Sequence, residues 1–213
     1  MLEVVSAQTP QVSKQNSLIE RARKGDDSAL AEMEKNGDVQ DLESLLHDPE
    51  YARKGFARFF LARLGDQEAL QYYACRSLTA DVSSIPDLMR QEVDLIGGDF
   101  TIQVYRHLLD SDPIFRPEIE RFMEDMREHG GDTWPILPSA LAMFKLSKLL
   151  PNSSVPKLRQ WELMRPGVDE EFKSKWRNWI DSHADELQKS KPIAVGIKFD
   201  QEYCSKLNTT SNR

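Results

Sequence analysis

Residues 37–66 read GDVQDLESLLHDPEYARKGFARFFLARLGD, and this stretch decides the fold class. After its first Gly-Asp pair, apolar residues recur at the three- and four-residue spacing of a helix with one buried face, and the same spacing returns after Tyr51. Asp48-Pro49 separates the two runs, since proline cannot continue a helix but suits the first turn of the next. The stretch therefore predicts two helices that pack as a hairpin.

The Gly-Asp pair recurs along the chain and marks where helices are expected to end and begin. It occurs at 25–26, 37–38, 65–66, 98–99 and 131–132, and the last three copies lie 33 residues apart. Glycine can adopt the left-handed conformation that closes a helix, and the aspartate after it can accept hydrogen bonds from the next helix. One unit of about 30 residues cannot bury its apolar face alone, so neighbouring units are expected to stack.

Residues 52–66, ARKGFARFFLARLGD, resemble the second helix and exit of a short bacterial HEAT-like (armadillo-type) repeat. Asp48-Pro49 lies where that pattern has its inter-helix turn, and the resemblance extends over about residues 25–150, weakening after residue 66. The segment from Trp176 to Trp179 also resembles the Trp-x-x-Trp helix that often follows such arrays. The resemblance implies an all-α protein built as a right-handed α-solenoid of stacked helical hairpins.

The same pattern divides the chain into four regions. Residues 1–16 are a flexible leader, 17–150 hold the HEAT-like repeats with an N-terminal cap, 151–188 are a connector and a C-terminal capping helix, and 189–213 form a tail. The capping helix carries an apolar stripe at helical spacing, so its tryptophans are interpreted as core residues and not as a ligand platform. Within the tail, residues 193–199 fit a short extended segment that lies along the array.

Composition limits the classes of function. The chain has 213 residues with 35 acidic and 28 basic side chains, and the net charge of −7 disfavours wholesale binding to nucleic acid. No apolar run approaches the ~20 residues of a membrane span. The four histidines lack metal-ligand spacing, and no phosphate loop or nucleophile elbow occurs. The sequence thus predicts a monomer without cofactor, metal or catalytic residues.

Cys75 and Cys204 leave two interpretations open. Cys75 continues an apolar helix face, which favours a buried, inert thiol. A disulfide with Cys204 requires both export and a docked tail. Val5-Ser6-Ala7 resembles the end of a clipped signal peptide, and Asn152 and Asn208 begin glycosylation-acceptor triplets, so a cytoplasmic and an exported location both stay open.

The repeated helical surface is the remaining candidate for function. In HEAT-like arrays the second helices line the concave side, and polar positions there are expected to include Arg53, Arg58, Arg90 and Arg121. Arginines arranged in this way can bind acidic side chains or a peptide carboxylate bidentately, although each of them also fits a solvated, salt-bridged helix face. The prediction is a non-catalytic protein-interaction module or scaffold that presents these residues to a protein partner.

A second hypothesis is an enzyme, since alkyl-purine DNA glycosylases and bilin lyases occur among HEAT-like proteins. A glycosylase needs a basic concave groove with exposed aromatic residues, which the net charge of −7 disfavours. A lyase needs a tetrapyrrole-sized cleft, which a sequence cannot reveal. Salt-dependent binding to duplex DNA would separate the glycosylase hypothesis from the scaffold hypothesis.

Overall fold

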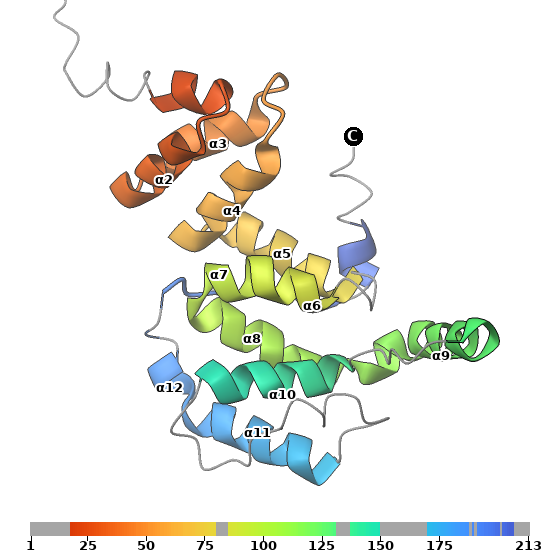
Figure 1. Ribbon diagram of the computed structural model, residues 1–213. Coiled ribbons are helices and arrows are strands. Elements are labelled where there is room, and N and C mark those ends of the chain that lie inside the picture. Colours follow the sequence, from red (N-terminus) through yellow and green to blue (C-terminus); the bar gives the residue numbers. More distant parts are fainter. Residues whose placement is uncertain are drawn as a thin grey trace, which may run out of the picture. The chain divides into compact units, whose positions relative to one another are not determined.

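The computed structural model describes residues 18–79, 85–130, 137–149, 170–187, 189, 191–200 and 202–206. In this part of the chain every regular element is a helix and no strand occurs, so the all-α prediction is confirmed (Figure 1). No helix in it has the length and apolar character that a membrane span needs. The leader, both glycosylation triplets and the proline-containing connector lie outside the described residues.

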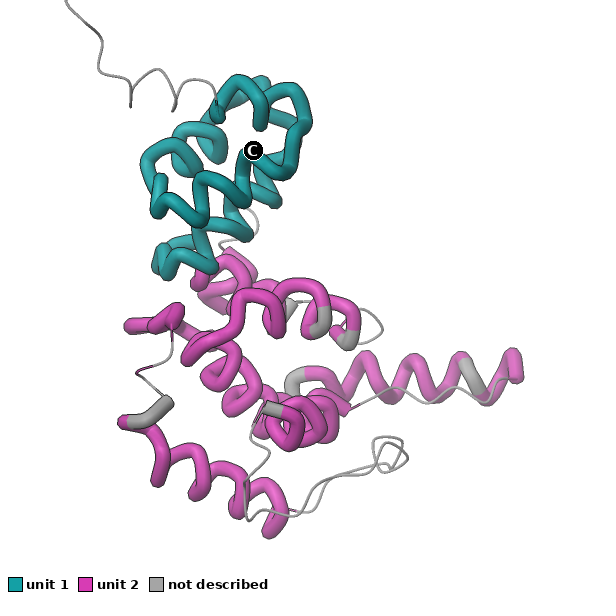
Figure 2. The backbone as a smooth tube through the Cα atoms, turned by 60° about the vertical axis from the view of Figure 1, so that its left-hand side comes forward, with its two compact units in different colours: residues 1–69 teal, residues 70–213 magenta. Residues whose placement is uncertain are grey.

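The first compact unit, Met1–Ala69, consists of short helices in its described part (Figure 2). A helical segment over residues 18–23 is followed by α2 (Asp27–Asn36), α3 (Val39–His47) and α4 (Lys54–Leu64). Helix α3 packs against both α2 and α4, so the two helices predicted from residues 37–66 form and meet. The buried core of this unit includes Leu30, Met33, Leu42, Leu45 and Leu61.

Helix ends in this unit follow the Gly-Asp pattern in part. Gly37 and Gly65 have left-handed backbones, with φ of 75° and 91°, and their N–H groups close α2 and α4. The Asp26 carboxylate accepts a hydrogen bond from the Ser28 N–H at 3.0 Å and so opens α2. Asp38 differs, because its side chain makes no hydrogen bond that caps α3. The glycine of the pair therefore ends helices more consistently than the aspartate begins them.

The second compact unit, Leu70–Arg213, holds the remaining helices. They are most of α5 (Gln67–Thr79), then α6 (Ile85–Leu88), the π-helical turn η1 (Met89–Val93), α7 (Asp94–Ile96), α8 (Gly98–Leu108), α9 (Asp112–His129), α10 (Pro138–Leu149), α11 (Glu170–Ser182) and α12 (Ala184–Leu187). Helices α8 and α10 pack together, which places them at the centre of this unit. Fully buried side chains on these two helices include Phe100, Val104, Tyr105, Met143 and Leu146.

A polar cluster joins three helices of this unit. The Asp94 carboxylate of α7 accepts hydrogen bonds from the Tyr105 hydroxyl of α8 and the Lys145 ammonium of α10. Burial, together with the bond to Asp94, raises the pKa of Tyr105 far above its usual range, so the phenol stays protonated and acts as a donor. Since every member has a partner, the cluster fixes α8 in place without leaving a buried charge alone.

The start of α8 departs from the Gly-Asp pattern. The sequence predicts that Gly98-Asp99 separates two helices, and α7 and α8 do adjoin here, but Gly97 caps both of them and Gly98 is already the first residue of α8. The backbone of Gly98 has φ +63°, and a Cβ built on it would lie 2.3 Å from the carbonyl carbon of Lys191. Glycine is required here because another part of the chain lies directly on the helix end, and this close approach leads to the candidate site.

Candidate functional site

Two of the four arginines predicted to bind a partner lie on or beside α4. Arg53 pairs with the Asp27 carboxylate, donates a hydrogen bond to the Gly25 carbonyl at 3.1 Å and stacks over the Phe56 ring. Arg58 is half-buried and also interacts within the chain. Arg53 therefore has a structural role in joining the start of α2 to the start of α4, whatever else it binds.

The other two arginines belong to the second unit. Arg121 is exposed on α9, and Arg90 lies in η1, with its side chain outside the described part of the structure. Partner binding by the four arginines stays a prediction.

The site that sequence reasoning missed is formed by the C-terminal segment, residues 191–200 and 202–206, which we name the strap. It is non-helical over 191–200 and ends in a helical turn beside α5 (the blue end of the ribbon in Figure 1). A disulfide links Cys204 of the strap to Cys75 of α5. Both sulfurs are buried with Leu78, and Phe199 and Tyr203 pack against them. The prediction of an inert free thiol at Cys75 is therefore wrong, because the docked tail brings the second cysteine to it.

The side-chain amide of Gln71 on α5 binds the main chain of the strap at one residue. Its Nε2 donates to the Lys198 carbonyl at 2.8 Å, and its Oε1 accepts from the Lys198 N–H, also at 2.8 Å. Both polar groups of that residue are thus satisfied by one side chain, in the way a neighbouring strand would satisfy them.

A second pair of side chains binds the strap four residues earlier. Gln103 Nε2 on α8 donates to the Ala194 carbonyl at 2.8 Å, and the Asp99 carboxylate accepts from the Ala194 N–H at 3.3 Å. Gln103 also donates to Asp99 at 2.7 Å, which fixes both side chains relative to each other. We name Gln71 the first clamp and the Asp99–Gln103 pair the second clamp. Together they hold the strap by its backbone.

A cleft of about 380 Å³ opens beside the strap. Helix α8 forms one wall, α11 and α12 contribute to the other, and the strap residues Ile197 and Phe199 complete it. The lining is mixed, since it includes polar and apolar side chains from both α8 and α11. The lining residues are Asp99, Ile102, Gln103, Arg106, His107, Asp110, Ile180, Asp181, Ala184, Ile197 and Phe199.

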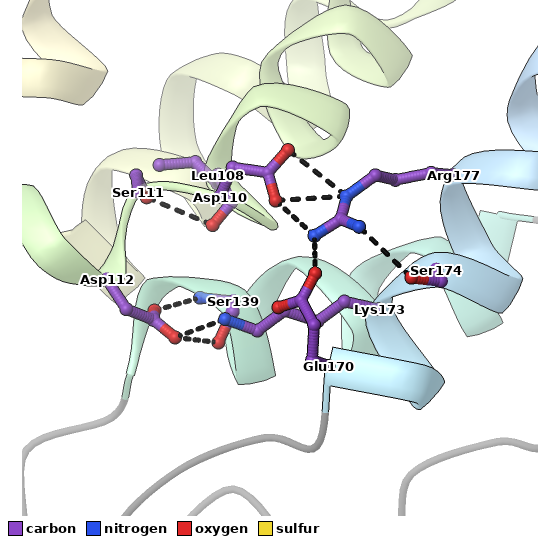
Figure 3. Close-up of polar contacts among 9 residues, drawn as sticks. All are labelled: Leu108, Asp110, Ser111, Asp112, Ser139, Glu170, Lys173, Ser174 and Arg177. Carbon is purple, nitrogen blue, oxygen red and sulfur yellow. Dashed lines mark hydrogen bonds and ion pairs between the residues drawn. The ribbon is translucent and has the colours of Figure 1, made fainter.

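Ion pairs fasten α11, one wall of the cleft, to the corner between α8 and α9 (Figure 3). Arg177 binds Asp110 at 2.5 Å and Glu170 at 2.6 Å, and these hydrogen bonds raise the pKa of Arg177 above its ordinary value. Deeper in the unit, Lys173 Nζ lies 2.9 Å from the Asp112 carboxylate, and both side chains are largely buried. The wall is therefore held by one exposed network and one shielded pair.

At the mouth of the cleft, Arg106 donates two hydrogen bonds to Asp181 of α11, at 3.0 and 2.7 Å. Both side chains are about half-exposed, so this pair contributes little to stability. Its position at the opening makes it available to exchange partners with a bound group. Arg106 and Asp181 can therefore select for charge at the rim of the cleft.

His107 lies where the strap and α8 meet. Its ring stacks on Phe199, with the centroids 4.7 Å apart and the planes 16° from parallel. Burial lowers the pKa of His107 below its ordinary value of 6.5, although Asp110 acts in the opposite direction. The imidazole is therefore neutral at pH 7, and its buried Nε2 has no hydrogen-bond partner among the described residues.

The polar groups of this arrangement are largely paired with one another. The carboxylates in and beside the cleft are engaged by arginine, glutamine or main-chain N–H groups. Within the described residues, no group of three His, Cys, Asp or Glu side chains could hold a metal ion. What the site offers a ligand is apolar surface, fixed dipoles and a charged rim.

Comparisons of this chain with protein-family models, with curated proteins and with solved structures found no match. The strap itself has a signal in the sequence, since residues 193–199 fit an extended segment. The clamps have no signal in the sequence, because glutamine is common on helix surfaces. Gln103 and Ala194 are 91 residues apart along the chain, and Gln71 and Lys198 are 127 residues apart.

Proposed function

We propose that this protein is a non-catalytic protein-interaction module, and that it binds its partner at the strap and the adjoining cleft. We further propose that its helical hairpins stack as a right-handed, HEAT-like α-solenoid, for which the recurring Gly-Asp pairs and the packing of α3 on α4 are the support. A scaffold of this kind functions by presenting a rigid surface, and affinity comes from a few residues on it.

The observation that carries the proposal is the exposure of apolar side chains on a rigid segment. Pro192 and Ala194 are buried against the helices, whereas Ile193 and Val195 are 40% and 69% exposed. We name Ile193 and Val195 the ridge. The clamps and the disulfide hold the ridge in place although much of its apolar surface stays exposed.

A pre-ordered apolar ridge is well suited to binding. The strap loses little conformational freedom when a partner docks, because it is already fixed by four main-chain hydrogen bonds and a disulfide. Fully burying an isoleucine or valine side chain contributes ~1.5–3 kcal/mol, of which a partner can still supply the part that corresponds to the exposed 40% of Ile193 and 69% of Val195. The two ridge residues can therefore supply the centre of an interface of modest size.

The cleft indicates the chemistry of the partner. Its volume of about 380 Å³ lies in the range that accepts one large apolar side chain or a small ligand. Three aspartates and one arginine line it, and Glu170 and Arg177 beside it neutralise each other. We therefore propose a protein segment with an apolar anchor for the cleft and a neighbouring lysine or arginine for the rim.

The test is selection from a random peptide library on the immobilised, oxidised full-length chain. We expect enriched peptides that combine an apolar residue with a neighbouring basic one. Their binding should fall at least tenfold on Val195→Asp and remain on Phe56→Asp, a control that changes an exposed apolar residue of the other unit. Peptides that bind Val195→Asp as well as the wild type contradict the ridge.

The same peptides test the four predicted arginines. A chain with Arg53, Arg58, Arg90 and Arg121 all changed to Glu should bind them as the wild type does if the ridge is the site. Loss of binding in that variant, with its helices intact by circular dichroism and with binding retained in Val195→Asp, would instead assign the interface to the arginines.

A further inference from the structure

The surface beneath the strap has the properties of a peptide-binding site in its own right. Each clamp satisfies both the N–H and the C=O group of one strap residue, Lys198 for Gln71 and Ala194 for the Asp99–Gln103 pair. Contacts of this kind recognise a backbone and do not depend on the side chain that it carries. Lys198 illustrates this, because its side chain is exposed while its main chain is bound.

We infer that the two clamps form a binding site for a non-helical peptide segment of another protein, and that the chain's own strap occupies this site. The inference goes beyond the proposed function. The ridge needs the strap to be docked, whereas this second site becomes available only when the strap has left.

The two helices that form the groove have buried core residues besides those that the strap covers at Cys75 and Leu78. Helix α8 is held by a core that includes Phe100 and Val104, and α5 by a core that includes Leu70 and Ala74. The clamp side chains project from these two helices. The site is therefore expected to persist in a chain whose strap is released.

The strap also shows which peptide the groove accepts. Ala194 is 6% exposed, so a small residue is required there, and Gly98 leaves room for the backbone that precedes it. Five positions later Phe199 stacks on the neutral imidazole of His107. A fitting partner segment has a small residue, an aromatic residue five positions later, and a free N–H just before the aromatic residue, which excludes proline at that position.

The disulfide keeps the site occupied in the oxidised chain. Cys204 ties the end of the strap to α5, close to the first clamp at Gln71. The tether gives the strap a local concentration in the millimolar range or above, against which a free peptide cannot compete. A competing segment is therefore expected to bind only after a thiol reductant has cleaved the disulfide, which leaves Cys75 and Cys204 as thiols and the reductant as its own disulfide.

The experiment uses the full chain with C204S and A194D, two changes in the strap that leave every groove residue intact. The second change places a carboxylate against Asp99 and so displaces the strap. The probe is a fluorescein-labelled peptide with the sequence of residues 191–200, followed by fluorescence anisotropy. We expect saturable binding to this variant, no binding to the oxidised wild type, and at least tenfold weaker binding when Gln71→Leu or Gln103→Leu is added.

A chemical control separates backbone recognition from non-specific binding of the peptide. A peptide N-methylated at Lys198 loses the N–H that Gln71 binds and should bind at least tenfold more weakly, whereas one N-methylated at Gly196 should bind like the parent peptide. Equal binding of both methylated peptides, or equal binding of the parent peptide to the wild type, would overturn the inference.

Absence of binding to the unlocked variant would also overturn it, provided that circular dichroism shows the helices intact. If that variant is unfolded, C204S is combined instead with F199A, a milder change that removes the strap's own stacking on His107 and leaves every groove residue intact, and failure of the peptide to bind this folded chain has the same meaning. Neither result bears on the ridge, which is tested on the oxidised wild type, so the two proposals can fail separately.

Discussion

Replacing Gly98 with alanine should destabilise the second unit through two separable effects. The backbone of Gly98 has φ +63°, a conformation that costs an L-residue roughly 1–2 kcal/mol. The new Cβ would also lie 2.3 Å from the carbonyl carbon and oxygen of Lys191 and 2.5 Å from the nitrogen of Pro192. These are backbone atoms, so no side-chain rotation can relieve the contact, and the strap must move away from α8.

If the strap moves away from α8, the hydrogen bonds of the second clamp are lost. The two hydrogen bonds between Ala194 and the Asp99–Gln103 pair contribute about 0.5–1.5 kcal/mol each, which adds ~1–3 kcal/mol to the loss. The disulfide still holds the far end of the strap, so the first clamp should survive. Gly98→Ala should therefore lower the free energy of unfolding by ~2–5 kcal/mol in total.

Gly130→Ala is the matched control. Gly130 has a similar φ of +72° in the same unit, but no atom of the described residues lies within 4 Å of its added Cβ, so a conformational cost applies without a contact with the strap. Urea unfolding followed by tryptophan fluorescence compares the two, because all four tryptophans lie beyond residue 70. Hydrogen exchange at the Ala194 amide should accelerate in Gly98→Ala alone. Equal destabilisation by the two substitutions, with unchanged exchange at Ala194, would refute the reasoning.

Three other outcomes follow from the same contacts. Cys204→Ala opens a loop that joins residues 129 positions apart, and it should lower the free energy of unfolding, measured by urea titration, by ~4–5 kcal/mol. The denatured wild type should show no thiol that reacts with Ellman's reagent before reduction. Burial lowers the pKa of His107 in the folded state, so the unfolded chain binds the imidazole proton more readily. The free energy of unfolding should therefore fall as the pH drops below about 6.5, and it should fall less in His107→Phe. If the variant shows the same pH profile as the wild type, the role assigned to His107 is wrong. Lys173→Ala removes the shielded partner of Asp112 and should lower the free energy of unfolding by ~2–3 kcal/mol, whereas Arg106→Ala at the exposed rim should lower it by ~1 kcal/mol or less. Equal losses of stability in thermal melts would contradict this ranking.

The helices of the first unit were predictable because their signals are local. Proline at 49 and glycine at 37 and 65 limit the backbone wherever they occur, and the observed ends of α3 and α4 lie within three residues of the predicted ones. At Gly98 the local signal is not sufficient to predict the structure. Gly98 carries the same Gly-Asp signal as Gly65, but Gly97 ends the preceding helix, and Gly98 is the first residue of α8, where the main chain of Lys191 lies against it.

The candidate site was not predictable, since every part of it depends on contacts between distant residues. Gln71 and Gln103 look like ordinary surface residues in the sequence, and only the docked strap gives them a partner. Cys75 was correctly placed on a buried helix face, yet its oxidation state depends on where Cys204 lies. The arginines suggested by the repeat pattern are surface residues whose role no contact in the structure tests.

The amino-acid sequence by itself determined that this protein is helical, where α3 and α4 lie and which of their faces are buried, because helix periodicity and capping act within a few residues. The tertiary structure alone decided that the C-terminal segment crosses α5 and α8, that its backbone is bound by side-chain amides, and that a cleft opens beside it. The physical reason is that main-chain recognition and disulfide pairing depend on proximity in space, and residues 75 and 204 acquire that proximity only when the helices between them have packed.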